Sequence, residues 1–380
     1  MSTQQIIENR AFAAEVKSKL HEIAYILEHN ETRFHGQGIG FGTMGLIIFW
    51  TYYYQYFEDE KILKKISLLL GKHYNVLKSQ AFVSDLIYFR TATDQLSQRE
   101  KELCECGWGY ELLASQEIIE PEHTRKVLET TNIRLYRKMI DIIMNPLWAH
   151  LSDALMIGYS CTAKQERIPK EFLRRFVSEL HNQVNQPCFD ERSRTIEPHD
   201  LLGILMLLSK IEQQHTNILW IPECRDKIYT TWIKSDISLF DRSDHHIQER
   251  DLWLLYAMMQ DVRHQSQAIE ILKHAEHSIN AFIKSVALGA GMERGLVCFG
   301  HMFNKLYRQT QNPFFETISA LCYQRFLRMT TTMESGKWST FSQGMFHVNF
   351  GIKNGLAGIG LALLAYVSNA NPQWDEYFYF

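Results

Sequence analysis

Ionisable and polar side chains stand at the starts of several apolar segments of this 380-residue sequence. The set holds one imidazole, four carboxylates, one amide and two guanidinium groups: His199, Asp153, Asp200, Glu249, Glu293, Gln248, Arg250 and Arg294. An imidazole beside a carboxylate can move protons near neutral pH, and a guanidinium can bind a carboxylate through two hydrogen bonds. If the segments start at one end of a common fold, these groups form one polar site.

Two interpretations of this set stay open at the level of the sequence. In the structural interpretation the arginines neutralise the neighbouring carboxylates in a buried network, because buried charges usually occur in pairs. In the functional interpretation His199 acts as a general acid or base beside carboxylates that the arginines hold in place. Residue types and spacing alone do not separate the two.

Helical periodicity covers most of the chain, because apolar residues recur three or four positions apart and strand-like alternation is scarce. Polar amphipathic helices are predicted at 13–28, 63–77, 124–144, 170–182 and 268–283. Between them, more apolar helices recur at intervals of roughly 45 to 60 residues. They are expected to begin near Gly42, Cys106, Asp153, Asp200, Arg250, Gly295 and Gly355.

This alternation predicts an all-α fold, an α/α toroid that is a double-layered barrel of about seven inner and seven outer helices. Glycines three apart at a helix start, as in Gly355 and Gly358, let neighbouring helices approach closely. No stretch rich in Ser, Gly and Pro separates two compositions. We therefore expect one domain over residues 1–380.

The overall composition is that of a globular protein, with 46% apolar residues, 22% charged residues and a net charge of -3. No basic run points to a nucleic-acid or membrane-surface partner, and no apolar run reaches the roughly 20 residues of a membrane span. The polar N-terminal stretch and the scattered cysteines predict a cytoplasmic protein with reduced thiols. Cys104 and Cys106 could hold a soft metal, but without a second pair nearby two buried thiols are favoured.

The segment NGLAGIGLALLAYVSNANPQWDEY, which begins at Asn354, resembles the C-terminal part of the lanthionine synthetase C family, the LanC cyclases. GIGFGTMGLIIFWTYYYQYFEDEKILKKI from Gly38 and GHMFNKLYRQTQNPFF from Gly300 are similar to further family segments. The resemblance covers nearly the whole chain. It implies the same α/α toroid.

The resemblance also implies a single Zn²⁺, held by two Cys and one His, that activates a substrate thiol for addition to dehydroalanine or dehydrobutyrine. The positions that match these ligands carry Gln248, Glu293 and Arg294, which supply neither thiolate nor imidazole. We therefore expect no metal and no other cofactor at that place.

A displaced metal site is the alternative. Cys298 and His301 lie three apart on one predicted helix, and His245 and His246 precede another. The ordinary interpretation of Cys298 is a buried thiol among apolar neighbours.

The family's proton-handling residues are an Asp before the third inner helix and a His before the fourth. They map to Ala149 and His199, so one is replaced and one is kept. Asp153 lies one helical turn from Ala149 and could take the place of the missing carboxylate.

These features predict a zinc-less LanC-like protein in the maturation of a ribosomally made, lanthipeptide-type peptide. It would bind the precursor peptide or a partner enzyme such as a dehydratase. The alternative is an active peptide-modifying enzyme, a thioether cyclase or another metal-free acid/base catalyst that uses His199 and the Arg/Glu cluster. A carbohydrate-active toroid would need two carboxylates at acid/base separation, and no motif marks such a pair.

Overall fold

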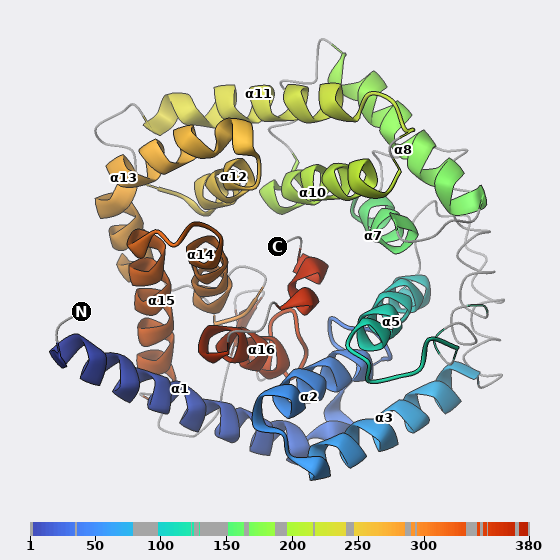
Figure 1. The fold of residues 1–380 in the computed structure, drawn as a ribbon, viewed down its shortest axis with the longest axis vertical. Coiled ribbons are helices and arrows are strands. Elements are labelled where there is room, and N and C mark those ends of the chain that lie inside the picture. Colours follow the sequence, from blue (N-terminus) through green and yellow to red (C-terminus); the bar gives the residue numbers. More distant parts are fainter. Residues whose placement is uncertain are drawn as a thin grey trace. The chain divides into compact units, whose positions relative to one another are not determined.

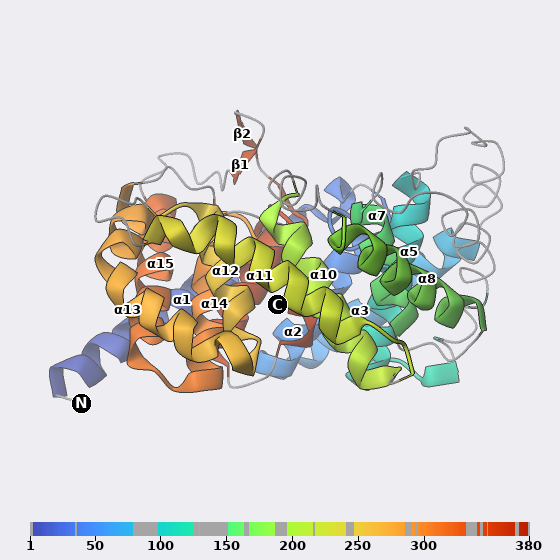
Figure 2. The same cartoon turned by 90° about the horizontal axis from the view of Figure 1, so that it is seen from above.

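The computed structural model describes residues 3–34, 36–78, 98–122, 124, 129, 151–162, 167–186, 196–215, 217–240, 247–285, 290–292, 295–331, 340–342, 345–347, 349–368 and 372–378. These residues are helical apart from loops and one antiparallel hairpin, β1 (Thr340–Ser342) and β2 (Met345–His347), in which Thr340 pairs with His347 (Figure 2). None of the described helices has the length and apolar character needed to cross a membrane. The predicted all-α class is confirmed.

Two kinds of helix alternate along the chain. The more exposed ones are α1 (Thr3–His29), α3 (Glu60–Lys78), α8 (Arg167–Val184), α11 (Ile221–Phe240), α13 (Val262–Ser285) and α15 (Pro313–Thr331). The more buried ones are α2 (Thr43–Phe57), α5 (Gln98–Ser115), α7 (Leu151–Thr162), α10 (Pro198–Gln214), α12 (Glu249–Met259), α14 (Leu296–Thr310) and α16 (Leu356–Val367), of which all but α5 and α14 are also clearly apolar in composition. The 3-10 helices η1 (Glu31–Arg33) and η3 (Gln373–Phe378) complete the described elements.

The chain divides into two compact units, each assembled from segments far apart in the sequence. Unit 1 contains Met1–Asp85, Gly109–Pro121 and Ile283–Trp374. Unit 2 contains Leu86–Trp108, Glu122–Phe282 and Asp375–Phe380. The single domain expected from the sequence stays a prediction.

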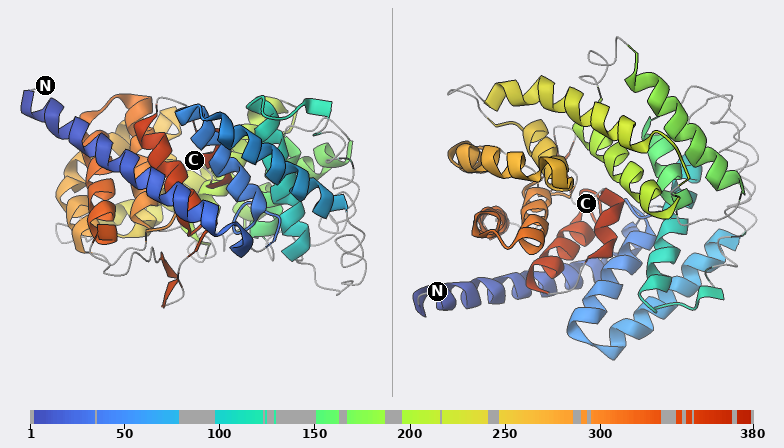
Figure 3. Two further views of the ribbon diagram at one scale, coloured as in Figure 1. Left: turned by 90° about the horizontal axis from the view of Figure 1, so that it is seen from below. Right: turned by 45° about the horizontal axis from the view of Figure 1, so that its top comes forward.

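In unit 1 the more buried helices α2, α14 and α16 lie together, and α3, α15 and α1 pack against them (Figure 1). The long helix α1 runs along α16, as Figure 3 shows from below. The α14–α15 pair is joined by a hydrogen bond of 2.8 Å from the Ser319 hydroxyl to the Gly300 carbonyl. Each pair buries one helix against a partner that is more exposed to solvent.

In unit 2 the apolar helices α7, α10 and α12 pack side by side, with α8 and α11 against them (Figure 1). The Tyr229 hydroxyl of α11 donates to the Ala257 carbonyl of α12 at 2.8 Å. The α/α pairing of the predicted toroid class is thus confirmed within each unit.

The predicted starts of the apolar helices fall within two residues of the observed ones, with one exception. Cys106 was expected at a helix start but lies inside α5, which begins at Gln98. The polar residues 98–105 are mostly good helix formers, so the helix extends ahead of its apolar part. The predicted helix at 124–144 lies almost wholly outside the described residues.

The starts of α2 and α16, both in unit 1, are closed by their own backbone in the same way. The first three N–H groups of α2, from Thr43 to Gly45, donate to the carbonyls seven residues earlier, at 3.3 Å each. The first three of α16 donate to the carbonyls of Asn349, Phe350 and Gly351 at 2.9 to 3.3 Å. These groups would otherwise be the orphan donors of a helix N-terminus, so both starts are satisfied internally.

Candidate functional site

The helices α7, α10 and α12 of unit 2 are parallel neighbours. The Tyr159 hydroxyl of α7 contacts the Gly203 carbonyl of α10 at 3.4 Å, and His215, after the end of α10, donates from Nε2 to the Thr162 carbonyl at 2.8 Å. The later contact residue of α7 therefore meets the later contact residue of the α10 segment, so the two helices run in the same direction. The starts of α7 and α10 consequently lie at the same end of unit 2.

The start of α12 joins this end of unit 2 through Trp253. The His199 ring of α10 meets the Trp253 ring edge-on, with centroids 5.4 Å apart and planes at 82°. Trp253 Nε1 in turn donates to Glu249 Oε1 at 3.3 Å. The structure therefore brings His199 and Glu249 to one indole, although it places an aromatic ring between imidazole and carboxylate.

Gln248 occupies the N-cap position of α12 and is exposed to solvent. Its backbone N–H donates to Asp251 Oδ2 at 2.8 Å, and Asp251 is only 3% exposed. A carboxylate three residues after the N-cap is the capping-box spacing, which the sequence displayed and which sequence reasoning missed. The start of α12 is therefore fixed by a buried carboxylate of its own first turn.

The remaining predicted site residues divide into those whose side chains are described and those whose side chains are not. Asp200 and Arg250 are half-buried in the first turns of α10 and α12. Asp153 lies in the first turn of α7, but its side chain is not among those described, and Ala149, Glu293 and Arg294 lie outside the described residues. The predicted pairing of the arginines with Glu249, Glu293 and Asp200 stays a prediction.

The possible metal ligands can be located in part. Cys298 and His301 are both buried in α14, and the His301 ring lies 5.0 Å from that of Trp374. His245 and His246 lie outside the described residues. Across the part of the chain that the structure describes, no group of three or more His, Cys, Asp or Glu side chains could hold a metal ion.

The Cys104 and Cys106 pair is buried in α5, at 2% and 0% exposure. Burial raises the pKa of the Cys106 thiol well above its usual value, and the neighbouring Glu105 and Glu102 carboxylates raise it further. A thiol that stays protonated is a poor metal ligand and a poor nucleophile. This favours the interpretation of Cys106 as a buried structural thiol.

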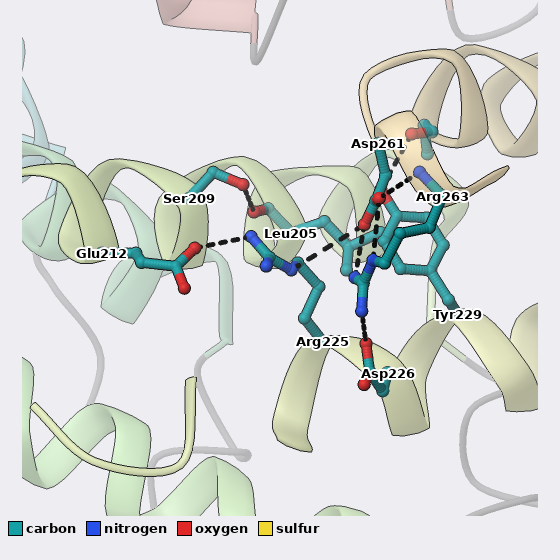
Figure 4. Close-up of polar contacts among 9 residues, drawn as sticks. Leu205, Ser209, Glu212, Arg225, Asp226, Tyr229, Asp261 and Arg263 are labelled. Carbon is teal, nitrogen blue, oxygen red and sulfur yellow. Dashed lines mark hydrogen bonds and ion pairs between the residues drawn. The ribbon is translucent and has the colours of Figure 1, made fainter. Parts of the chain in front are cut away.

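A network of charged side chains joins the C-terminal end of α10 to the C-terminal end of α12, away from the helix starts (Figure 4). Arg225 of α11 donates to Glu212 near the end of α10 at 2.8 Å and lies 3.8 Å from Asp261, which follows α12. Arg263 bonds to the same Asp261 at 3.0 Å and also pairs with Asp226. The hydrogen bond from Arg263 lowers the pKa of Asp261 to about 2. A paired network of the kind proposed for the helix starts therefore exists at the helix ends.

Comparisons with known proteins do not identify a family. No family model and no curated protein matches the chain. Six chains of solved structures match. One is described as a polysaccharide lyase, with 10% sequence identity, a TM-score of 0.42 and coverage of 93% of this chain and 96% of that chain. A likeness this distant supports neither a fold nor an activity for the present chain.

Proposed function

We propose that this chain is a LanC-like protein that binds a ribosomally made precursor peptide, or an enzyme that modifies it, without zinc chemistry. The proposal rests on the resemblance of the glycine-rich segments at Gly38 and Asn354 to the LanC family. The paired helices of both units agree with it. The chain would act in the cytoplasm, and the six cysteines of the described residues are free thiols, as that compartment requires.

The observation that carries the proposal is the chemistry at the start of α12. The resemblance implies a zinc-bound thiolate at the position of Gln248, an exposed amide at the N-cap of this helix. An amide oxygen is a poor ligand for Zn²⁺ compared with thiolate or imidazole. The helix start is instead stabilised by the Asp251 carboxylate. Polar recognition without a metal fits these groups better than thiolate activation does.

The binding groups of the proposed site are those at the starts of α10 and α12. Half-buried Arg250 offers a planar fork for a peptide carboxylate, and Glu249 offers an acceptor for peptide N–H groups. The indole of Trp253, already in contact with His199, is 1% exposed and keeps the imidazole oriented. This set suits a peptide better than an uncharged apolar ligand.

The test uses a synthetic peptide that carries one dehydroalanine and one cysteine. Fluorescence anisotropy reports its binding, and alkylation of the cysteine reports catalysis, because thiol addition across the double bond consumes the thiol without changing the mass. We expect binding with no acceleration of thiol loss. Arg250→Ala should weaken binding roughly tenfold, as expected for loss of a charge-assisted hydrogen bond. Lys227→Ala, an exposed lysine of α11, is the matched control.

The alternative function, metal-free catalysis with His199 as general base, predicts a different outcome of the same experiment. Thiol loss would then be accelerated by the protein, and His199→Ala would slow it by roughly 10² to 10⁴. A binder should instead retain most of its affinity in His199→Ala. Accelerated thiol loss that depends on His199 would overturn the binding proposal.

A further inference from the structure

The last turn of η3 lies on a polar and aromatic surface of unit 2. We call this the η3 surface and define it by four side chains: Glu105 and Trp108 of α5, Tyr159 of α7 and Lys210 of α10. Residues 375–380 belong to unit 2. The occupant is the acidic and aromatic sequence Glu376-Tyr377-Phe378.

The acidic residue of the occupant meets the cation of the surface. Lys210 Nζ forms an ion pair with the Glu376 carboxylate and lies 5.6 Å over the centroid of the Tyr159 ring. The ring holds the ammonium group through a cation–π contact, so the charge is positioned for a carboxylate. The side chains of Lys210 and Glu376 are 26% and 41% exposed, so water and salt weaken the pair.

The tyrosine of the occupant meets the carboxylate and the indole. The Tyr377 hydroxyl donates to Glu105 Oε1 at 2.7 Å, and its ring centroid lies 6.1 Å from that of Trp108 at 48°. Phe378 is 2% exposed. Cation, carboxylate and indole on the surface therefore each match one feature of the occupant.

We infer that the η3 surface recognises peptide segments in which a tyrosine follows an acidic residue, and that η3 is its intramolecular ligand. The contacts with Glu105, Trp108 and Lys210 are all made by side chains, so a separate peptide with the same side chains can make them too. A tethered ligand has an effective concentration in the millimolar range, so η3 excludes dilute peptides until it is displaced. The partner is therefore a peptide or protein segment that carries Glu-Tyr or a close equivalent.

This inference goes beyond the proposed function and does not rest on it. Lys210 lies roughly three helical turns from His199 along α10, so the two sites can be altered separately. His199→Ala should leave binding at the η3 surface unchanged, and Lys210→Met should leave binding of the dehydroalanine peptide unchanged. Failure of one proposal is thus distinguishable from failure of the other.

The experiment measures anisotropy of a labelled synthetic peptide, Asp-Glu-Tyr-Phe with both ends blocked, on the full chain and its variants. Glu376→Gln combined with Tyr377→Phe weakens the tethered ligand and should increase peptide affinity roughly tenfold. Lys210→Met weakens the surface itself and should reverse that gain when added to the double variant. Lys227→Met is the control lysine change, and Asp-Gln-Phe-Phe is the control peptide.

Recognition predicts that changes in η3 raise peptide affinity and that the Lys210→Met change in the surface lowers it. A purely structural contact predicts no such difference in sign. If η3 only stabilises the fold, the double variant and Lys210→Met should both lower the melting temperature, and neither should gain peptide affinity. That result would overturn the inference. Sedimentation of the double variant adds a second check. Dimers held by exchanged η3 segments, without peptide binding, would identify a second copy of the chain as the occupant and also overturn it.

Discussion

The starts of α2 and α16 in unit 1 and the start of α12 in unit 2 are built by different means. In unit 1 the starts of α2 and α16 are closed by carbonyls of the preceding loop, without any side-chain cap. In unit 2 the start of α12 is closed by the Asp251 carboxylate, and ionisable side chains surround it and the start of α10. Backbone closure uses glycine, whereas side-chain closure leaves room for charged residues.

This difference indicates where chemistry can remain in the chain. A helix N-terminus is a natural anion site only while its N–H groups are available. The first three N–H groups of α2 and of α16 are already bound, so these starts offer no such donors. The starts in unit 2 instead present an imidazole, a carboxylate and a guanidinium, from His199, Glu249 and Arg250. Among these four helices, candidate recognition chemistry therefore lies at the starts of α10 and α12, in unit 2.

The largest expected effect tests the backbone closure in unit 1. A Cβ at Gly358 would lie 1.9 Å from the Ile352 carbonyl oxygen, and one at Gly45 would lie 2.2 Å from that of Ile39. Gly358→Ala should therefore lower the free energy of unfolding by about 3 kcal/mol, measured by urea denaturation.

The control for this prediction is Gly71→Ala in α3, where an added Cβ meets nothing within 4 Å. It should raise the stability by roughly 0.5 to 1 kcal/mol, because alanine favours the helix over glycine. Equal effects of the two substitutions would show that the close approach of the Ile352 carbonyl is not the reason why position 358 requires glycine.

The next effect concerns the pH dependence of stability and a histidine that binds the loop before α2. His73 is 1% exposed, donates from Nε2 to the Gln37 carbonyl at 2.9 Å and meets the Tyr110 hydroxyl through Nδ1 at 3.1 Å. Burial lowers its pKa from 6.5 to about 4. The folded state therefore favours the neutral ring, so stability is complete above pH 6.5 and falls as the pH drops towards 4. The loss should reach about 3 kcal/mol.

The measurement is the urea midpoint between pH 7 and pH 4 for the native chain and for His73→Gln. The variant should be less stable at pH 7 but should lose that part of the pH dependence. An unchanged slope in His73→Gln would assign the acid sensitivity to other groups.

The sequence predicted the alternation of helices and most of their starts, because the apolar period and the small residues at each start are local signals. The glycine spacing was interpreted as a means for neighbouring helices to approach. Gly360, which lies outside the spacing of three, does permit such an approach, since an added Cβ would lie 2.5 Å from Phe49 of α2. Gly45 and Gly358, however, face carbonyls of their own preceding loops, which periodicity cannot reveal.

The candidate site was less predictable from sequence, because it depends on contacts between helices. Trp253 was not singled out, yet it joins His199 to Glu249. The η3 surface was not predicted either, since Glu105 and Tyr377 are far apart in the chain and no local pattern pairs them. The capping role of Asp251 was missed too, although its position three residues after the N-cap is visible in the sequence.

A smaller effect tests the side-chain closure in unit 2. Asp251→Ala removes the acceptor of the Gln248 N–H and should destabilise the chain by about 1 to 2 kcal/mol. Glu197→Ala is the comparison, because this exposed N-cap residue of α10 makes no side-chain cap hydrogen bond. It should change the stability by less than about 0.5 kcal/mol. Equal losses in both variants would indicate that the hydrogen bond between Asp251 and the Gln248 N–H does not contribute to stability.

The smallest expected effect decides whether the polar groups of unit 2 are kept for stability or for recognition. Glu249→Gln preserves an acceptor for Trp253 Nε1 and removes only the charge, so the urea midpoint should shift by less than about 0.5 kcal/mol. Residues retained for function often contribute little to stability, so a neutral effect on folding agrees with a binding role. The same variant should weaken binding of the dehydroalanine peptide, because the carboxylate no longer provides a charged acceptor for its N–H groups. A loss of more than about 2 kcal/mol in stability with unchanged peptide binding would make Glu249 part of a structural network instead.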